Sequence, residues 1–250
     1  MAIGGKRSPL RAPPVRFPGQ SVYEEIERVR EDAINDSLVL VAMTVAMTMA
    51  AGLQWLLRTP PATFFFASLT LFVGSLAYAV PRILRARERL RQLRQGHEGE
   101  RAVAEYLDSL VASDGVRVLH DVAAESFNLD HVVIAPQGIY VIETKTISKP
   151  VNRDAIVEFD GERVLLGGFE PPESHVGQAR SHARWLRRLL REVLGREYPV
   201  WPVLFYPGWY VQATPEGKRA SIWVLEPKQF GGHLRRVPVT LRGRDVAEVF

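Results

Sequence analysis

The sequence predicts a mixed α/β domain with a central sheet, attached to a hairpin of two transmembrane helices. Two uncharged stretches near the N-terminus are each long enough to cross a bilayer, which takes about 20 apolar residues. After them, segments of helical periodicity alternate with short apolar segments bounded by turn residues, a pattern typical of a sheet with flanking helices. The composition fits a folded chain, because 46% of the 250 residues are hydrophobic and 24% are charged.

The lack of cysteine removes several classes of chemistry. With no cysteine in the chain, disulfides, thiolate zinc sites, iron–sulfur clusters and cysteine nucleophiles are excluded. The sequence also has no glycine-rich phosphate loop of the Walker type, so ATP use is not indicated. The formal net charge of +4 is mildly basic.

The two membrane helices are predicted at 37–57 and 62–80, within a hairpin that spans 37–81. Neither stretch has a charged residue, whereas the helices of a soluble core usually carry a polar stripe. Two buried helices of a soluble protein are the alternative. The residues between them, Arg-Thr-Pro-Pro at 58–61, predict a tight turn.

Basic residues lie on both outer sides of the hairpin, and its turn holds only one of them, Arg58. By the positive-inside rule, we expect a multi-pass protein of the cell membrane with two spans, in which both termini and the domain after the hairpin lie in the cytoplasm. The flanking basic residues are Lys6, Arg7, Arg11, Arg16, Arg28 and Arg30 before the hairpin, and Arg82, Arg85, Arg87, Arg89, Arg91 and Arg94 after it.

The segments beside the hairpin are polar. Residues 1–36 are predicted to be a cytoplasmic N-terminal segment that is partly disordered, with a short helix at 21–36. Residues 82–95 predict a basic juxtamembrane helix. Its arginines are expected to form a collar at the lipid headgroups, because anionic lipid attracts basic segments there. A contact with nucleic acid is the alternative.

The first half of the soluble domain predicts one helix and three strands. The helix is expected at 99–111, where apolar residues recur on one face. A short strand is predicted at 116–120. Two further strands, at 129–135 and 138–145, are joined by a Pro-Gln turn and so predict a hairpin.

The second half continues the alternation of strands and helix. An Asp-Gly pair between 156–159 and 163–166 predicts a second hairpin. Residues 174–194 predict a long amphipathic helix, and further strands are expected at 198–206 and 220–225. This order of elements predicts a mixed sheet with helices on its faces.

The charged residues that end the 138–145 strand are candidate catalytic residues. Glu143 and Lys145 are two residues apart, so they share one face of the strand. The strand is apolar up to them, and charges at the end of a buried strand need partners or a ligand. If the 129–135 strand pairs with this one, Asp130 approaches Glu143.

Two neighbouring carboxylates repel each other, and a divalent cation is one way to balance their charge. Oxygen ligands suit Mg²⁺ or Mn²⁺ and not zinc. Lys145 would then hold the attacking water or stabilise charge on a phosphate, a combination typical of phosphodiester hydrolysis. A structural ion pair between Lys145 and either Asp130 or Glu143 is the alternative, and the spacing alone does not choose between the two.

Two more polar residues lie on inward faces of helices. Glu100 is on the apolar face of its helix, close to the expected N-terminus, where a carboxylate is costly unless something binds it. Stabilisation by the helix dipole is the alternative. Gln178 lies among inward positions of the 174–194 helix, where its amide contacts a nucleotide or a ligand, or simply a backbone group at the helix start.

A stripe of arginines follows the 174–194 helix at three- and four-residue spacing. Such a stripe can follow a phosphate backbone, which makes these residues candidates for nucleic-acid binding. A solvated helix face is the alternative. The arginines are Arg180, Arg184, Arg187, Arg188 and Arg191.

Several segments together resemble the nuclease-related domain, the NERD family. The order and spacing match over 96–212, and the Asp-His to Glu-Thr-Lys block is the most specific part; the membrane hairpin and the C-terminal extension 213–250 are not covered. The segments are GHEGERAVAEYL (96–107), NLDHVVIAPQGIYVIETK (128–145), GQARSHARWLRRLL (177–190) and PVWPVLFYPGWYV (199–211).

This resemblance implies a restriction-endonuclease-like, mixed-sheet core of the PD-(D/E)xK superfamily and a metal-dependent nuclease activity. In that superfamily the Asp and the Glu bind Mg²⁺ and the Lys supports the water, which assigns Asp130, Glu143 and Lys145. Glu100 and the carbonyl of Thr144 are the further metal ligands that the resemblance implies.

The resemblance also places Gln178 near the site, but the pattern departs there. Related nucleases often have Gln-x-x-x-Tyr on this helix, whereas in this chain Gln178 is followed by His182. A stacking role at this position is therefore in doubt.

We expect a membrane-anchored, cytoplasm-facing nuclease that depends on Mg²⁺ or Mn²⁺. Its partners are nucleic acid, with DNA favoured over RNA, and the lipid bilayer. The alternatives are a catalytically idle module that tethers nucleic acid to the membrane, and a regulatory module that binds protein. The sequence gives no prediction of the oligomeric state.

Overall fold

The computed structural model describes residues 17–57, 62–124, 126–149 and 154–250. The predicted turn at 58–61, and the predicted disorder before residue 17, lie outside these ranges. Two compact units are distinguished, one formed by Ser21–Glu98 and the other built mainly from Gly99–Phe250.

The first unit is helical. α1 (Gln20–Val29) continues through one π-helical segment, η1 (Arg30–Asn35), into α2 (Asp36–Leu56), so the expected short helix and the first span form one helical run. The first part of α3 (Ala62–Asp114) completes the unit. Both ends of α2 lie within one residue of the first predicted span, and α3 begins at Ala62, where the second predicted span begins.

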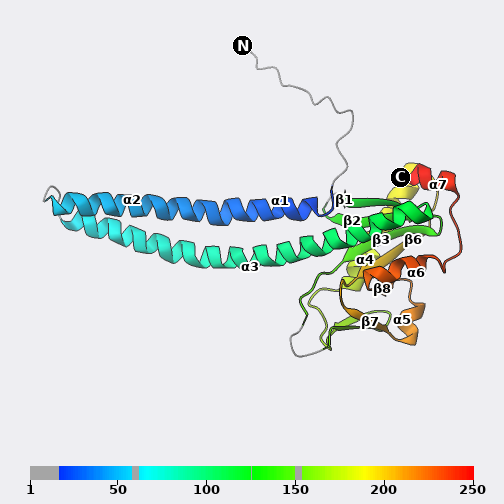
Figure 1. Cartoon of the computed structure of the whole chain (residues 1–250). Helices are drawn as coiled ribbons and strands as arrows, with labels where there is room; N and C mark the ends of the chain where they lie inside the picture. The colour runs from blue at the N-terminus through cyan, green and yellow to red at the C-terminus, as the bar shows by residue number, and fades with distance from the viewer. Residues whose placement is uncertain (1–16, 58–61, 125, 150–153) are drawn as a thin grey trace, which may run out of the picture. The chain divides into compact units, whose positions relative to one another are not determined.

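The apolar stretches of α2 and α3 lie side by side (Figure 1). The hydroxyl oxygens of Thr44 and Ser75 are 2.9 Å apart, and the Thr48 hydroxyl donates to the carbonyl of Ser68 at 3.1 Å. By length and composition both helices can cross a membrane. Most of their apolar side chains are exposed, unlike those of core helices in a soluble protein.

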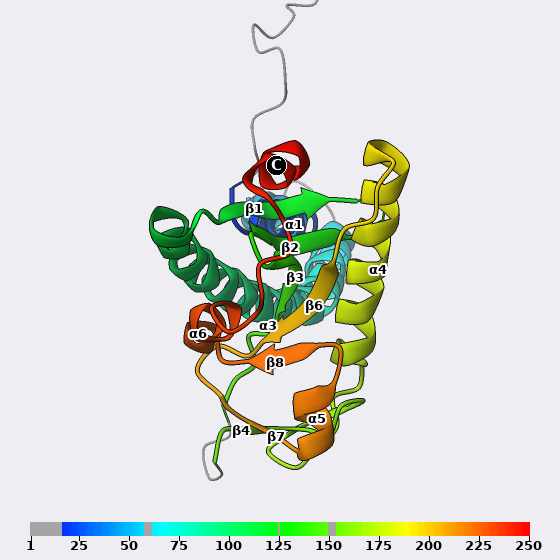
Figure 2. The same cartoon turned by 90° about the vertical axis from the view of Figure 1, so that its right-hand side faces the viewer.

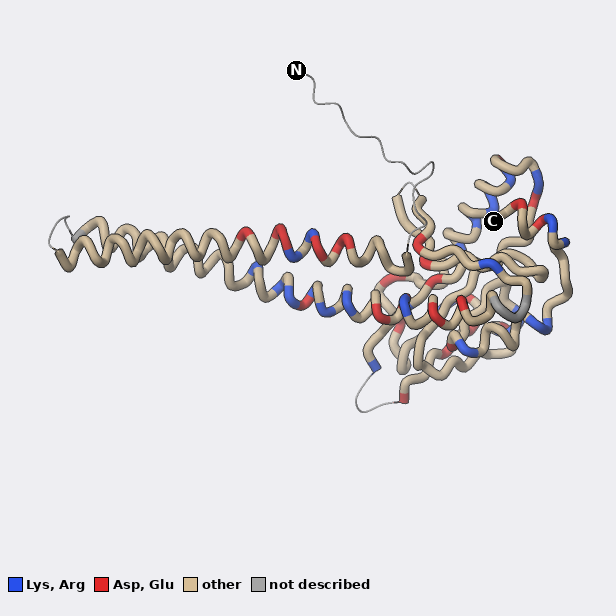
Figure 3. Tube along the Cα trace, turned by 45° about the horizontal axis from the view of Figure 1, so that its top comes forward, with Lys and Arg blue, Asp and Glu red and all other residues tan. Residues whose placement is uncertain are grey.

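The charges of this unit gather away from its apolar stretches (Figure 3). Glu25 forms an ion pair with Arg89, and the guanidinium of Arg82 donates to the carbonyl of Asp32 at 2.8 Å. The apolar stretches 37–57 and 62–80 contain no charged residue, which is the distribution that a bilayer-spanning hairpin needs.

α3 is one continuous helix of 53 residues, which corrects the expectation of separate helices at 82–95 and 99–111. Gly96 and Gly99 do not interrupt it, because a single glycine costs a helix only about 1 kcal/mol. Glu100 is therefore in the interior of a helix and not near an N-terminus, so the helix dipole does not stabilise its carboxylate.

The second unit is built on a five-stranded mixed sheet with the strand order β1-β2-β3-β6-β8. β1, β2 and β3 pair antiparallel, and β6 and β8 continue the sheet in parallel with β3. The predicted mixed α/β architecture is confirmed. The strands are β1 (Arg117–Ala123), β2 (Asn128–Ala135), β3 (Gly138–Thr144), β6 (Val200–Phe205) and β8 (Trp223–Leu225).

A smaller sheet with the order β5-β4-β7 adjoins the larger one. β4 (Ile156–Phe159) and β5 (Val164–Leu166) form the hairpin that the Asp-Gly pair predicts. β7 (Tyr210–Ala213), which pairs in parallel with β4, was not predicted. Its four residues alternate between exposed and half-buried, and a segment this short gives too few positions to show the period of a strand.

Helices cover both faces of the larger sheet (Figure 2). The part of α3 from Gly99 onward packs on one face together with α6, and α4 packs on the other together with α7. The helices are α4 (His175–Leu194), α5 (Pro215–Arg219), α6 (Phe230–Leu234) and α7 (Gly243–Val249), with a 3-10 turn, η2 (Pro227–Gln229).

The central strand β3 is buried on both faces, as its sequence predicts. Tyr140 and Ile142 pack with Leu107 of α3 on one face, and Val141 packs with Leu186 of α4 on the other. Because side chains alternate along a strand, Glu143 lies on the face that α4 covers.

The ends of α4 agree with the predicted 174–194 helix. The Ser174 hydroxyl caps the first turn by accepting from the N–H of Gly177 at 3.1 Å. Gly195 ends the helix in the left-handed conformation, with φ of 67°, which glycine adopts without strain. α4 therefore begins at His175, with Gln178 in its first turn.

Candidate active site

The candidate site forms where β3 ends. Glu143 is the last but one residue of the strand and is 4% exposed. The N–H of Lys145 donates to the carbonyl of Phe205 at 2.8 Å, which continues the pairing of β3 with β6 beyond the assigned strand. Lys145 is therefore held on the same face as Glu143, and its side chain is 20% exposed.

The Glu143 carboxylate accepts three side-chain hydrogen bonds. Its Oε1 receives the ammonium of Lys145 at 2.9 Å and the amide of Gln178 at 2.8 Å. Its Oε2 lies 3.0 Å from Nδ1 of His182. Burial raises the pKa of Glu143, but the hydrogen bonds from His182 and Lys145 outweigh this effect and leave the pKa below its usual value.

Lys145 and Gln178 also contact each other, because the Lys145 ammonium donates to the Gln178 carbonyl oxygen at 2.8 Å. Glu143, Lys145 and Gln178 thus form a closed triangle of hydrogen bonds between the sheet and α4. Such a triangle fixes the rotamers of all three side chains.

Asp130 reaches the same place from β2. His131 pairs with Ile142, so the next residues along the two strands, Asp130 and Glu143, lie opposite each other. Asp130 Oδ2 accepts the N–H of Thr144 at 2.7 Å. Burial, together with the charges of Glu143 and Glu100, raises the pKa of Asp130 well above its usual value.

Glu100 approaches from α3. Burial raises its pKa to about 7, with further contributions from the charges of Asp121 and Glu143. These contributions mean that Glu100 shares the electrostatic environment of the site. The structure therefore brings Glu100, Asp130, Glu143, Lys145 and Gln178 together.

Sequence reasoning missed two residues of this cluster. Asp121 is buried on β1 with φ of 48°, opposite Asp130, in a gap of the pairing between the two strands. His182 contacts Glu143 from α4, one helical turn after Gln178. Their signals were present, because Asp121 directly follows the predicted 116–120 strand and His182 is four residues from Gln178 on a helix.

The side chains of the cluster offer oxygen donors for a divalent cation. Asp130, Glu143 and Glu100 offer carboxylate oxygens. Burial, together with the repulsion between these carboxyl groups, raises the pKa of Asp130 and of Glu100, so a bound cation would replace the protons that they retain. This donor set fits a hard cation such as Mg²⁺ or Mn²⁺. Within the described residues, however, no three His, Asp or Glu side chains already converge as a metal shell.

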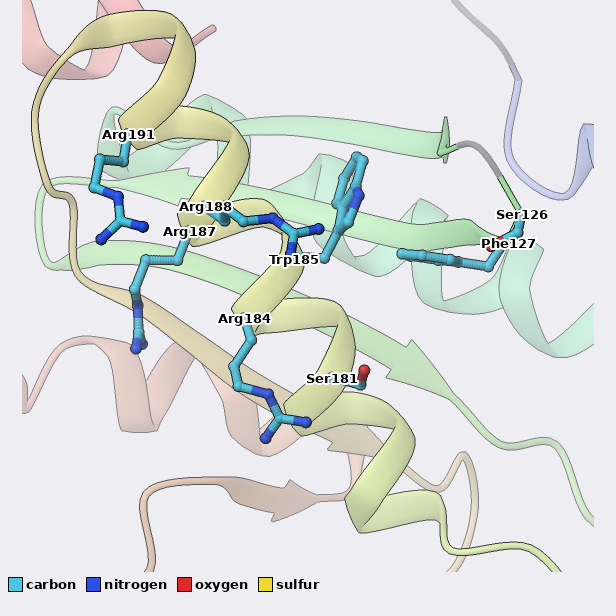
Figure 4. Close-up of a pocket in the computed structure, with 8 residues that line it drawn as sticks. All are labelled: Ser126, Phe127, Ser181, Arg184, Trp185, Arg187, Arg188 and Arg191. Atoms are coloured by element: carbon cyan, nitrogen blue, oxygen red, sulfur yellow. The ribbon is translucent and has the colours of Figure 1, made fainter.

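The predicted arginine stripe divides into two parts. Arg180 is engaged, because its guanidinium pairs with Glu162 at 2.8 Å and donates to the carbonyl of Gly161 at 2.8 Å. The remaining four line a groove of about 630 Å³ on the outer side of α4 (Figure 4). These four are Arg184, Arg187, Arg188 and Arg191.

Gly99→Ala is expected to disturb the site by overpacking. A Cβ at Gly99 would lie 1.7 Å from the hydroxyl oxygen of Thr146 and 2.6 Å from its Cβ, so this close approach of α3 requires glycine. We expect a loss of about 1–3 kcal/mol in the free energy of unfolding, measured by urea denaturation. Gly96→Ala is the matched control, since a Cβ at Gly96 meets nothing within 4 Å. Equal stability of the two variants would contradict the packing described.

The stability of the metal-free protein is expected to fall as the pH rises from about 5 to about 7. Glu100 keeps its proton in the folded state up to a pKa of about 7, whereas the unfolded carboxyl releases it near 4.5. The folded state therefore binds more protons in this window, and its stability decreases with pH. The raised pKa of Asp130 also makes the folded state less stable as the pH rises. The pKa of Glu143 is lowered, so this group makes the stability rise with pH, but only below its ordinary pKa and therefore outside this window.

Thermal unfolding of the full chain in neutral detergent with EDTA, at a series of pH values, measures this effect. Glu100→Gln should flatten the dependence, because it removes the group that titrates near 7. A melting temperature that rises through the same window would show that the Glu100 carboxyl is not buried among like charges.

The fold and the cluster define a class: a mixed α/β domain with carboxylates and a lysine at the ends of neighbouring strands, covered by a helix that supplies an amide. Residues 95–207 match the family model of the nuclease-related domain. This part of the chain is therefore a nuclease-related domain, as the sequence pattern predicts.

No curated protein matches the chain. Among solved structures, SfsA from Pyrococcus furiosus in complex with Ca²⁺ matches with 16% identity and a TM-score of 0.26, over 52% of this chain and 54% of SfsA. The alignment thus spans about half of either protein, and a TM-score this low supports no conclusion about the site.

Proposed function

We propose that the protein is a membrane-anchored nuclease that uses a divalent cation to hydrolyse phosphodiester bonds. The observation that carries the proposal is the hydrogen-bonded triangle of Glu143, Lys145 and Gln178 at the end of β3, with Asp130 opposite Glu143. The triangle lies in a nuclease-related domain, which supports nucleic acid as the substrate.

Asp130, Glu143 and Glu100 would hold Mg²⁺ or Mn²⁺, with the carbonyl of Thr144 as a further ligand. When bound, such a cation lowers the pKa of water and offsets charge on the phosphate. Lys145 orients the attacking water and stabilises negative charge that develops on the phosphate oxygens.

Gln178 and His182 are positioning residues in this proposal. Both hold the Glu143 carboxylate by hydrogen bonds, Gln178 at 2.8 Å and His182 at 3.0 Å. Because a ligand held by such partners keeps one orientation, their loss typically weakens metal affinity or activity by about 10- to 100-fold.

The experiment is a cleavage assay with the full chain in neutral detergent. Labelled single-stranded and duplex DNA and RNA are incubated with Mg²⁺, with Mn²⁺ and with EDTA. We expect cleavage with either cation and none with EDTA, and we expect Asp130→Asn to abolish it. Cleavage that continues in EDTA, or at the wild-type rate in Asp130→Asn, would refute the metal-dependent mechanism.

A second function, binding of nucleic acid without cleavage, is favoured by one observation. Both oxygens of Glu143 already have protein partners, and the described side chains do not converge as a complete metal shell. This alternative predicts that labelled nucleic acid binds the full chain with the same affinity in wild type and Asp130→Asn, and that no cation supports turnover.

Membrane anchoring is supported by two helices that can cross a bilayer and whose apolar side chains are mostly exposed. We propose that they form a hairpin with both termini and the nuclease-related domain in the cytoplasm. The chain has no cysteine, so single cysteines report the orientation. In intact cells, a membrane-impermeant maleimide should label Thr59→Cys but not Ser109→Cys. Labelling of Ser109→Cys in intact cells would contradict this orientation, because it would place the domain outside the cytoplasm.

A further inference from the structure

The groove on α4 combines positive charge with aromatic rings. Its lining includes Arg184, Arg187, Arg188 and Arg191 together with Trp185 and Phe127, and of the described residues that line it none is acidic. In Figure 4, three of the arginines follow one edge of α4, while Arg188 and Trp185 lie on the side that faces Phe127. The groove therefore has a cationic edge and an aromatic edge.

Three of the four arginines of the groove are available to a ligand, whereas the guanidinium of Arg187 donates to the carbonyl of Val200 at 2.5 Å. Among the described residues, Arg184 has no acidic partner. Arg188 and Arg191 pair with Glu192 and Glu197 at 3.9 and 3.3 Å, but their side chains are 62% and 58% exposed. Ion pairs of this kind are weak and easily exchanged for a phosphate.

The aromatic edge is connected to the candidate active site. The ring of Phe127 stacks on His182, with centroids 4.5 Å apart and planes at 4°, and meets the edge of Trp185 at 5.3 Å. His182 in turn contacts Glu143 at 3.0 Å. The residues Gln178, His182 and Trp185 follow one another along α4 at four- and three-residue spacing, so the groove residue Trp185 lies one helical turn after the site residue His182.

We infer that this groove binds single-stranded nucleic acid, with phosphates on the arginines and an unpaired base on Trp185. A base must expose its ring face to stack on a side chain, and in a duplex neighbouring bases cover that face. From Gln178 to Arg191 α4 rises about 20 Å, a length over which several nucleotides extend. The inference rests on the proposed function for the reaction at Glu143, and it adds the class of substrate.

Fluorescence anisotropy tests the groove independently of catalysis. The full chain in neutral detergent is titrated into a labelled oligonucleotide of about 15 nucleotides, as a single strand and as a duplex, with EDTA present so that no divalent cation contributes. We expect the single strand to bind more tightly. Trp185→Ala should weaken single-strand binding by roughly 10-fold, and Trp185→Phe, which keeps an aromatic ring, should retain most of the affinity.

The arginines are tested by the salt dependence of binding. The double variant Arg184→Gln/Arg188→Gln should reduce the slope of log Kd against log salt by about 1.4, because each phosphate contact contributes about 0.7 for a single strand. Arg101→Gln is the matched control, since Arg101 is 71% exposed on α3 and pairs only with exposed Glu105 among the described ion pairs.

Unchanged single-strand affinity in Trp185→Ala and in the double arginine variant would overturn the inference, as would a preference for the duplex. The result is separable from the proposed function. If the groove variants lose affinity while the wild type cleaves nothing with Mg²⁺ or Mn²⁺, the groove stands and the nuclease proposal fails. If the wild type cleaves nucleic acid and the groove variants bind with normal affinity, the nuclease proposal stands and the inference about the groove fails.

Discussion

Lys145→Ala is expected to lower the rate of metal-dependent cleavage by on the order of 10²–10⁴-fold. The lysine carries the positive charge nearest to Glu143, and its ammonium is fixed by Glu143 at 2.9 Å and by Gln178 at 2.8 Å. Its loss removes the group that orients the water and stabilises charge on the phosphate, but it removes no carboxylate oxygen. The rate is measured in single-turnover cleavage of a labelled oligonucleotide by the full chain.

The affinity for Mn²⁺ is the control for this prediction. Because Lys145 is a competing cation and not a metal ligand, Mn²⁺ should bind Lys145→Ala at least as tightly as the wild type. A variant that cleaves at the wild-type rate would remove Lys145 from the mechanism. A variant that has lost Mn²⁺ would show that the lysine maintains the structure of the site instead.

Glu143→Ala is expected to destabilise the domain by about 3–5 kcal/mol, because it leaves the cluster of a partly buried cation and two polar side chains without their common acceptor. Glu143 is 4% exposed and accepts from Lys145, Gln178 and His182. Glu143→Gln keeps the shape and one acceptor oxygen, so it should cost less, about 1–3 kcal/mol. The measurement is the midpoint of urea unfolding.

Glu105→Ala is the matched control for stability, since Glu105 is 68% exposed and pairs only with Arg101 among the described ion pairs. We expect its unfolding midpoint to equal that of the wild type. Both Glu143 variants should lose cleavage, although only Glu143→Ala loses much stability. Equal midpoints for Glu143→Ala and the wild type would mean that the buried network does not hold the end of β3.

Local patterns in the sequence predict much of this fold. The alternation in β2 and β3, the Pro-Gln and Asp-Gly turns and the apolar face of α4 each depend on neighbouring residues alone, and the structure confirms them. The shared face of Glu143 and Lys145 follows from the same alternation. The approach of Asp130 needed only the pairing of two consecutive strands, which is the commonest arrangement in a sheet.

The missed features depend on contacts between distant segments. The spacing from Gln178 puts His182 on the same face of α4, but its contact with Glu143 joins residues 39 apart along the chain, which the helical spacing does not predict. Asp121 has φ of 48°, a conformation that a strand pattern does not predict. The close packing of α3 against Thr146, which leaves room only for a glycine at 99, likewise joins segments that are distant in the sequence.

The central claim is that carboxylates from neighbouring strands bind one hard cation. Electron paramagnetic resonance of Mn²⁺, titrated with the full chain in neutral detergent, measures this directly because free and bound Mn²⁺ give different signals. We predict one Mn²⁺ bound per chain in the wild type and an affinity at least about 10-fold weaker in Asp130→Asn, whose amide still accepts from the N–H of Thr144. Binding that is absent in the wild type, or identical in the two proteins, would contradict the claim.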